Sequence, residues 1–316
     1  MQEKREGQAV KIARAAAEVW DVDAKDAKEL AFVSRVLVQA FMPHSDPKKP
    51  GWIRKNGNFT LTLKSGVDVL SNGDFLPIGL PYGTIPRLML AWLNSEAIRN
   101  AQDTNNTTPH IINLGRSLSS FLEKIGVART GGKRGGITAF KAQAEKLFRA
   151  EVSISCTGSN YLAERDMKIT DGRFVFWNSK NADQPTLWEN SVELSERFYK
   201  LLVNTPVPLD WRVLRAIKQS PMALDLYMWL THRMSYLQKP VSIRWETLQG
   251  QLGSEVERLD HFREKVRKHL KKITIIWKDL HIDASASDAI YLYPTRSLTR
   301  PTKRKTLNVK KYCSKP

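Results

Sequence analysis

Basic residues recur at helical spacing between residues 257 and 272, in an arrangement that could neutralise nucleic-acid phosphates. Seven Lys or Arg residues stand there against three acids. Steps of three and four residues place one stripe of side chains along a helix: Arg258, His261, Lys265, Lys268 and Lys272. A second column at i, i+4 consists of Arg263, Arg267 and Lys271, and Glu257, Asp260 and Glu264 form an acidic ridge between the two. Each cation that meets a phosphate releases a counterion, which favours binding whatever the base sequence.

An apolar face lies on the other side of this segment, formed by Val256, Leu259, Phe262, Val266, Leu270 and Ile273. The pattern predicts a helix over about 255–272, with Ser254 as its N-terminal cap. A strand is expected over 273–278, where Lys278 would extend the contact as part of a wing. The alternative is an amphipathic helix whose exposed charges pair with one another, as Glu264 and Lys268 could.

A glycine-rich basic segment at residues 129–136 is a second candidate anion site. Arg129, Lys133 and Arg134 surround four glycines, and Lys141 follows in the helix expected over 137–149. Glycines let backbone N–H groups approach an anion, which the positive end of a helix also attracts. A flexible loop or linker is the alternative. The segment is no P-loop, because its lysine is one place late and no Ser or Thr follows it.

Residues for catalysis or metal binding are not grouped in the ways that enzymes need. The six histidines contain no H-x-H pair and no H-E-x-x-H motif, and His261 and His269 are expected at the surface of the basic helix. Cys156 and Cys313 stand far apart and in no C-x-x-C unit, which favours a reducing cytoplasm. We therefore predict a protein that is not an enzyme and has no cofactor or metal. The longest apolar runs are too short to cross a bilayer, so no membrane partner is expected.

The formal net charge of +18 is concentrated towards the C-terminus. Residues 251–316 carry 16 Lys or Arg and 7 Asp or Glu, a net of +9, which is half the excess. Seven basic residues and no acidic one lie between residues 300 and 316. Such a block is typical of an arm that contacts nucleic acid, or of a solubilising tail.

One order of elements occurs twice along the chain. A long helix, a short strand, a short helix, a turn, a second helix and two paired strands are expected first over 86–99, 110–113, 117–125, 137–149, 152–156 and 173–177. They return over 213–217 and 223–234 (one long helix interrupted by Pro221), 241–244, 246–252, 255–272, 273–278 and 289–293. A helix, turn, helix and two-stranded ribbon is the winged-helix arrangement. We expect an α+β fold of two tandem winged-helix domains with a pseudo-duplicated topology.

This duplication sets the expected domains. Residues 1–42 form an N-terminal helical extension, with helices at about 8–19 and 25–41. Residues 43–185 form the first winged-helix domain, for dimerisation, DNA contact or both, and residues 186–296 form the second, the main DNA-binding domain. Residues 297–316 form a basic tail. Within the first domain, Asn56-Gly57 predicts a hairpin turn before a strand at 59–63, and residues 64–85 are expected to be irregular.

Four motifs resemble the RepA-type plasmid replication initiators, which start theta replication. They are LPYGTIPRL at residues 80–88, LGRSL at 114–118, TGGKRGGIT at 130–138 and SPMALDLYMWL at 220–230, the last being the most specific. The similarity runs from about residue 41 to residue 294. No invariant catalytic set is carried over from the family, and residues 1–40 and the tail after Arg300 fall outside the resemblance.

The resemblance implies a protein that binds repeated sites in double-stranded DNA at a plasmid origin. It would promote duplex opening, recruit host replication proteins such as a helicase, repress its own gene and exchange between monomer and dimer. A winged-helix transcriptional repressor without a replication role is the first alternative. A nicking or primase-like enzyme is the second, and the absence of its usual ligand clusters speaks against it.

Overall fold

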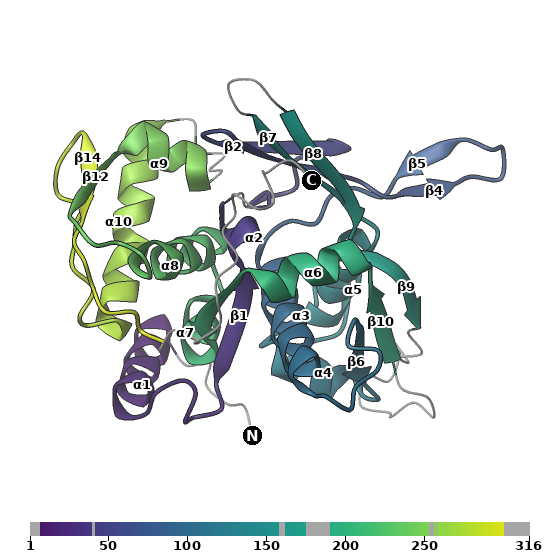
Figure 1. Cartoon of the computed structure of the whole chain (residues 1–316), viewed down its shortest axis with the longest axis horizontal. Coiled ribbons are helices and arrows are strands. Elements are labelled where there is room, and N and C mark those ends of the chain that lie inside the picture. The colour runs from purple at the N-terminus through teal and green to yellow at the C-terminus, as the bar shows by residue number, and fades with distance from the viewer. Residues whose placement is uncertain are drawn as a thin grey trace.

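A computed structural model describes residues 7–39, 42–157, 162–174, 190–252, 256 and 258–299. Helices and strands are mixed along the chain, as expected for an α+β protein. The elements of residues 84–194 lie on one side of the molecule and those of residues 211–292 on the other (Figure 1). One continuous hydrophobic core runs through both sides. No helix in the described part of the chain is long and apolar enough to span a bilayer.

The helices of the first half are those expected from periodicity. They are α3 (Thr84–Gln102), α4 (Leu118–Lys124) and α5 (Gly136–Phe148), and the strand β6 (Ile111–Gly115) lies between the first two. The hydroxyl of Ser117 accepts the Ser120 N–H at the start of α4. Gly126 takes the left-handed conformation after α4, with a φ of 73°.

Two sheets use the strands of the first half. One contains β6, β9 (Thr170–Phe174) and β10 (Asn190–Leu194) in the order β6-β10-β9. The other contains β2 (Gly51–Asn56), β3 (Phe59–Lys64), β7 (Glu151–Thr157) and β8 (Leu162–Lys168) in that order. The predicted pairing of 152–156 with 173–177 is therefore wrong. β7 pairs with β3 and β8 instead, because its buried side chains complete the apolar face that β3 begins.

The second half begins with α6 (Glu196–Asn204), β11 (Pro206–Asp210), α7 (Trp211–Ile217) and α8 (Pro221–Met234). It continues with β12 (Val241–Arg244), α9 (Trp245–Leu252), α10 (Leu259–Ile276), β13 (Ile282–Asp283) and β14 (Ala289–Leu292). Its three strands pair in the order β12-β14-β13. In both three-stranded sheets, the strand that comes last in the sequence, β10 or β14, lies in the centre and pairs with the other two.

The start of the chain departs from the prediction after its first helix. α1 (Gln8–Asp21) forms as expected, but the helix predicted over 25–41 is replaced by β1 (Leu30–Ser34) and the short α2 (Arg35–Gln39). Residues 31–34 are all buried, and β1 pairs antiparallel with β11. A strand covered on both faces shows no alternation of apolar and polar residues, so its sequence cannot be distinguished from a helix by periodicity.

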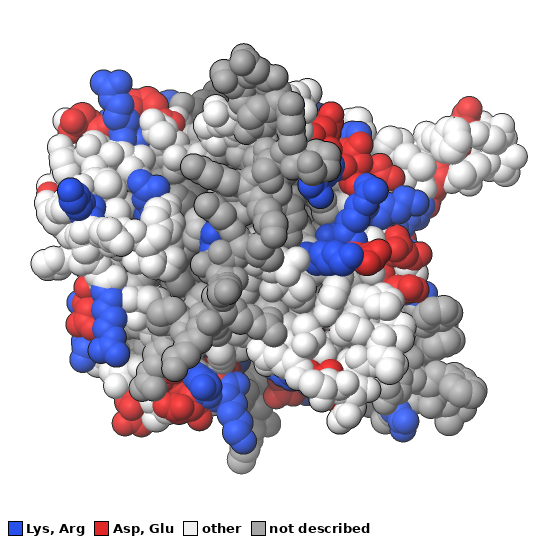
Figure 2. Space-filling view, viewed as in Figure 1, with Lys and Arg blue, Asp and Glu red and all other residues white. Residues whose placement is uncertain are grey.

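A hairpin arm projects from the first half where irregular structure was predicted (Figure 1). Its strands are β4 (Val67–Val69) and β5 (Phe75–Pro77), and the arm is mostly uncharged surface in Figure 2. The turn is closed by local hydrogen bonds at Asn72 and Asp74, with Gly73 at a φ of 89°. Strands of three exposed residues leave no apolar alternation, which is why this arm was not predicted.

The helix α10 runs further than the sequence predicted. The strand expected over 273–278 is wrong, because α10 continues to Ile276 and Lys278 lies in the turn that follows. The isoleucines there favour a strand locally, but Ile273 and Ile276 are buried in the core, and packing overrides local propensity. The helix begins at Leu259 rather than at residue 255, and the predicted cap, Ser254, lies outside the described residues.

A buried ion pair joins the two halves. Arg87 of α3 donates from Nε to Asp225 Oδ1 of α8 at 2.6 Å and from Nη2 to Oδ2 at 2.7 Å. The same guanidinium donates to the carbonyls of Met42, Pro43 and Gly83. His44 Nε2 lies 2.8 Å from Asp225 Oδ2. All polar atoms of this buried pair therefore have partners, which is the condition for tolerating charge in a core.

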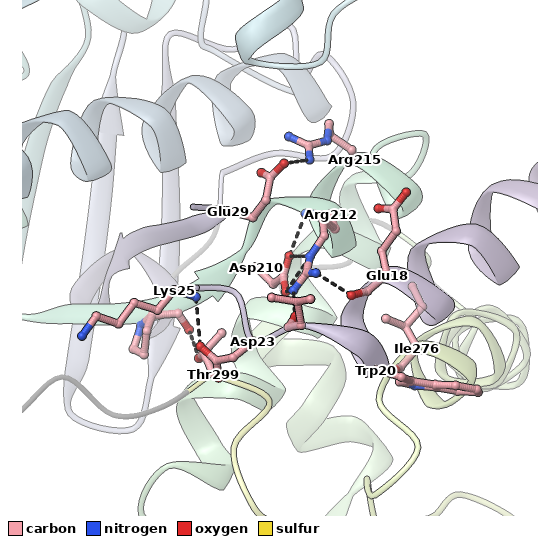
Figure 3. A network of polar contacts seen from close by, with 12 residues as sticks. Glu18, Trp20, Asp23, Lys25, Glu29, Asp210, Arg212, Arg215, Ile276 and Thr299 are labelled. Atoms are coloured by element: carbon pink, nitrogen blue, oxygen red, sulfur yellow. Dashed lines mark hydrogen bonds and ion pairs between the residues drawn. The ribbon is translucent and has the colours of Figure 1, made fainter. Parts of the chain in front are cut away.

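A polar network ties the N-terminal segment to the second half (Figure 3). Arg212 of α7 pairs with Asp210 at 2.7 Å and donates to the carbonyls of Glu18 at 2.6 Å and Val22 at 2.7 Å. The indole of Trp20 donates to the carbonyl of Ile276 at 2.8 Å. The first helix, α1, therefore packs against α7 and α10 of the second half.

Candidate nucleic-acid interface

The helix α10 buries one side and leaves charged side chains on the others. Phe262, Val266, Leu270 and Ile273 lie in the core as predicted, together with Ile276. Opposite them, His261, Lys265 and Lys268 are exposed, and Lys272 is half-buried at the edge of the same stripe. We call these four residues the α10 stripe.

Arg258 stands apart from the stripe in its backbone position. It is the residue before the first turn of α10, and its guanidinium pairs with Asp260 at 2.5 Å. The hydrogen bond from Arg258 lowers the pKa of the Asp260 carboxyl. One acid of the ridge, Asp260, is therefore paired with Arg258. Lys265 and Lys268 form no ion pair among the described residues.

The second basic column is directed at the loop between β13 and β14. Arg267 donates from Nε to the carbonyl of Ala284 at 2.6 Å, and from Nη2 to those of Ser285 at 3.1 Å and Ala286 at 3.0 Å. Arg263 donates to the carbonyl of Ser287. These two arginines hold the loop against α10, whereas Lys271, the third member, is exposed. Their placement near the apolar side of the helix was the one signal for this role.

Trp245 completes the attachment of this loop. Its indole donates to the carbonyl of Ala286 at 3.1 Å, and the guanidinium of Arg267 lies 5.5 Å from its ring centroid. The loop that joins β13 to β14 is therefore fixed from both α9 and α10. Lys278 is not part of this ribbon. Its ammonium lies 5.3 Å from the ring centroid of Trp20, on the turn after α10.

The glycine-rich segment before α5 folds onto itself. Thr130 accepts the Gly136 N–H with its hydroxyl at 2.9 Å and the Ile137 N–H with its carbonyl at 3.1 Å. A Cβ built on Gly135 would lie 2.2 Å from the carbonyl oxygen of Gly131. The backbone at residue 135 therefore lies too close to that of Gly131 for any residue with a side chain. Two N–H groups that an anion could use are thus already occupied. The exposed basic side chains around them are Arg129, Lys133, Arg134 and Lys141.

His269 is not the surface group that was predicted. It is half-buried on α10, with Nε2 3.1 Å from the hydroxyl of Ser220 at the start of α8. Burial, and then the charges of Lys272 and Lys268, lower the pKa of its imidazole to about 4. A neutral ring therefore connects α10 to α8 at neutral pH. Among the described residues, no three His, Cys, Asp or Glu side chains are grouped so that they could hold a metal ion.

Comparison with known proteins identifies the chain. A family model described as "Plasmid encoded RepA protein" matches residues 80–246, more than half of the 316 residues. The chain belongs to this RepA family. The resemblance predicted from the four motifs is thereby confirmed, and Arg87 and Asp225 lie within the matched region. The match ends at the start of α9, so the α10 stripe lies beyond it.

Two solved structures are similar in fold to this RepA family member. A crystal structure of selenomethionine derivatives of domain 2 and domain 3 of RctB matches with a TM-score of 0.52 and 10% identity, covering 85% of this chain and all of the other. A second structure, of RctB domains 2–3, matches with a TM-score of 0.50 and 10% identity, covering 83% of this chain and 96% of the other. No curated protein sequence is significantly similar to the chain.

Proposed function

We propose that this RepA family member initiates plasmid replication by binding repeated sites in origin DNA through two winged-helix units. Membership of the RepA family supports the replication role. The shared strand orders, β6-β10-β9 and β12-β14-β13, support the duplication. In each unit the first strand follows a long helix, α3 or α8, and a helix-turn-helix pair, α4 and α5 or α9 and α10, lies between the first two strands of the sheet in the sequence. Because β10 pairs with β6 and β9, we set the boundary between the units after Leu194 rather than at residue 185.

The α10 stripe is the proposed main contact with DNA, and this single feature carries the proposal. It lies on the second helix of a helix-turn-helix, the element that enters the major groove in this class of protein. Lys265 and Lys268 are exposed cations that would meet phosphates. The loop held by Arg263 and Arg267 would then lie beside the DNA as the wing.

The remaining roles are assigned to other parts of the chain. The first unit would mediate dimerisation in a monomer–dimer equilibrium, with Arg129, Lys133, Arg134 and Lys141 as an additional DNA contact. The basic tail from residue 297 would contact the backbone of DNA. We further propose that the protein opens the duplex without covalent chemistry or a cofactor, recruits host replication proteins such as a helicase, represses its own gene and acts in the cytoplasm.

Footprinting on the plasmid DNA that flanks the gene tests this proposal. We expect several evenly spaced protected repeats, with permanganate-reactive thymines in an adjacent A·T-rich segment at saturating protein. Protection of one palindrome without reactive thymines would instead favour a repressor. The absence of any protected site would contradict origin binding altogether.

A further inference from the structure

A large pocket lies away from the α10 stripe, between the N-terminal segment and the second half. Its volume is about 1050 Å³. Side chains of α1 and α2, the C-terminal end of α8, the turn after α10 and residues 296–298 line it. The lining includes Lys278 and two residues of the tail, Ser297 and Leu298, but no member of the α10 stripe.

Two arginines, Arg35 and Arg233, line this pocket. The Nε atoms of Arg35, from α2, and Arg233, from α8, are shielded from solvent and have no hydrogen-bond partner. Among the described residues, Arg233 makes one side-chain hydrogen bond, from Nη1 to the hydroxyl of Tyr236 at 2.9 Å. Neither guanidinium forms an ion pair with any described residue. A cation that is partly removed from water without a partner is costly, so this geometry calls for an anion.

The imidazole of His232 lies close enough to both arginines for their charges to affect its pKa. Burial, and then the charges of Arg35 and Arg233, lower the pKa of His232 to about 3. The ring is therefore neutral and does not add to the repulsion. Burial also lowers the pKa of the Arg35 guanidinium. The pocket therefore brings together two guanidinium groups, of Arg35 and Arg233, and the neutral imidazole of His232.

Charge and aromatic side chains at the rim narrow the class of ligand. Lys278 and Arg296 bring the basic residues of the lining to four, against two acids, Asp23 and Asp279. Trp20 and Tyr236 are exposed aromatic side chains of the same lining. A guanidinium binds phosphate oxygens in bidentate fashion, and an aromatic ring offers a stacking surface for a base.

We propose that this pocket binds a free nucleotide, with its phosphate groups on Arg35 and Arg233. The cavity is of the size that encloses a nucleotide and much larger than inorganic phosphate requires. The ligand would bridge α2 of the N-terminal segment and α8 of the second half. This site is independent of the DNA contact proposed for α10.

Calorimetric titration of the full chain with ATP, and with pyrophosphate as a base-free probe, tests the site. We expect ATP to bind, and Arg35→Gln combined with Arg233→Gln to weaken it at least tenfold. Arg244→Gln removes one exposed cation outside the lining and serves as the matched control, with unchanged affinity. Thermal unfolding without ligand checks that the variants fold. If the double variant does not fold, Arg35→Lys and Arg233→Lys, which keep the charge but lose the planar fork, should each weaken binding.

Three results would overturn the proposal. They are no heat with either probe at millimolar concentration, equal affinity in folded arginine variants, and binding of a dT oligonucleotide with none of ATP. Origin-DNA retention by gel shift is measured on the same proteins. We expect it to be unchanged in the double variant, so failure of the nucleotide site and failure of origin binding are separate outcomes.

Discussion

Arg87 and Asp225 meet in a bidentate, buried ion pair although 138 residues separate them in the sequence. They belong to two of the motifs that carry the resemblance to RepA proteins, LPYGTIPRL and SPMALDLYMWL. Neither residue was singled out from the sequence. The pair joins α3 to α8, so one residue of each motif holds the two halves together.

Asp225→Ala should strongly destabilise the fold. It leaves the Arg87 guanidinium buried without its counter-charge, and the loss of one partner of a buried pair costs about 3–5 kcal/mol. Urea unfolding followed by tryptophan fluorescence measures this loss. Glu196→Ala, which removes an exposed pair with Lys200, is the control and should barely change the midpoint. Equal midpoints for the two variants would show that the Arg87–Asp225 pair contributes little.

Lys265→Ala combined with Lys268→Ala should weaken binding to all duplexes. The logarithm of the binding constant should also depend less steeply on the logarithm of salt concentration, by about 0.9 for each lost phosphate contact. Fluorescence anisotropy between low and moderate salt gives the slope. Lys55→Ala with Lys200→Ala removes two exposed lysines elsewhere and controls for net charge. An unchanged slope in the α10 variant would contradict the assignment of this stripe.

Arg267→Lys should behave like Arg267→Ala rather than like the wild type. Lysine keeps the charge but cannot reach three carbonyls from one planar group. We expect a loss of about 1.5–3 kcal/mol in unfolding free energy, and faster hydrogen exchange at residues 284–287. Recovery of wild-type stability and exchange in Arg267→Lys would mean that charge alone matters at this position.

Gly136→Ala should destabilise the protein although alanine favours helices. Its Cβ would lie 2.0 Å from the carbonyl oxygen of Ala128, and relieving such a clash costs about 1–3 kcal/mol. Gly131→Ala, five residues earlier, meets no atom within 4 Å and is the matched control. Thermal unfolding compares the two. Similar midpoints would show that the glycine-rich segment is not held as tightly as its hydrogen bonds indicate.

Apart from the helix expected over 25–41, the helices were predictable because their signals are local. The apolar face of α10 depends only on neighbouring residues, and the structure contains it. The strands depend on distant partners. β1 needs β11, and β7 needs β3, so no window of sequence could show either pairing.

The roles of charged residues were harder to predict than their positions. Lys265 and Arg267 lie two residues apart on one helix, yet one is exposed and the other binds three loop carbonyls. Which role an arginine takes depends on the loop between β13 and β14, and that loop's course is set by tertiary packing. The pocket around Arg35 and Arg233 could not be predicted from the sequence for the same reason, because α2 and α8 come together only in the folded chain.

The pairing of β1 with β11 has a consequence for biosynthesis. The strand β1 is synthesised before its partner, residues 206–210, exists. The interval is longer still between Trp20 and Ile276, whose carbonyl accepts the indole N–H of Trp20. At translation rates of roughly 5–20 residues per second, β11 is completed about 9–35 s after β1. During that interval the apolar segment LAFV lacks the strand with which it pairs in the folded protein.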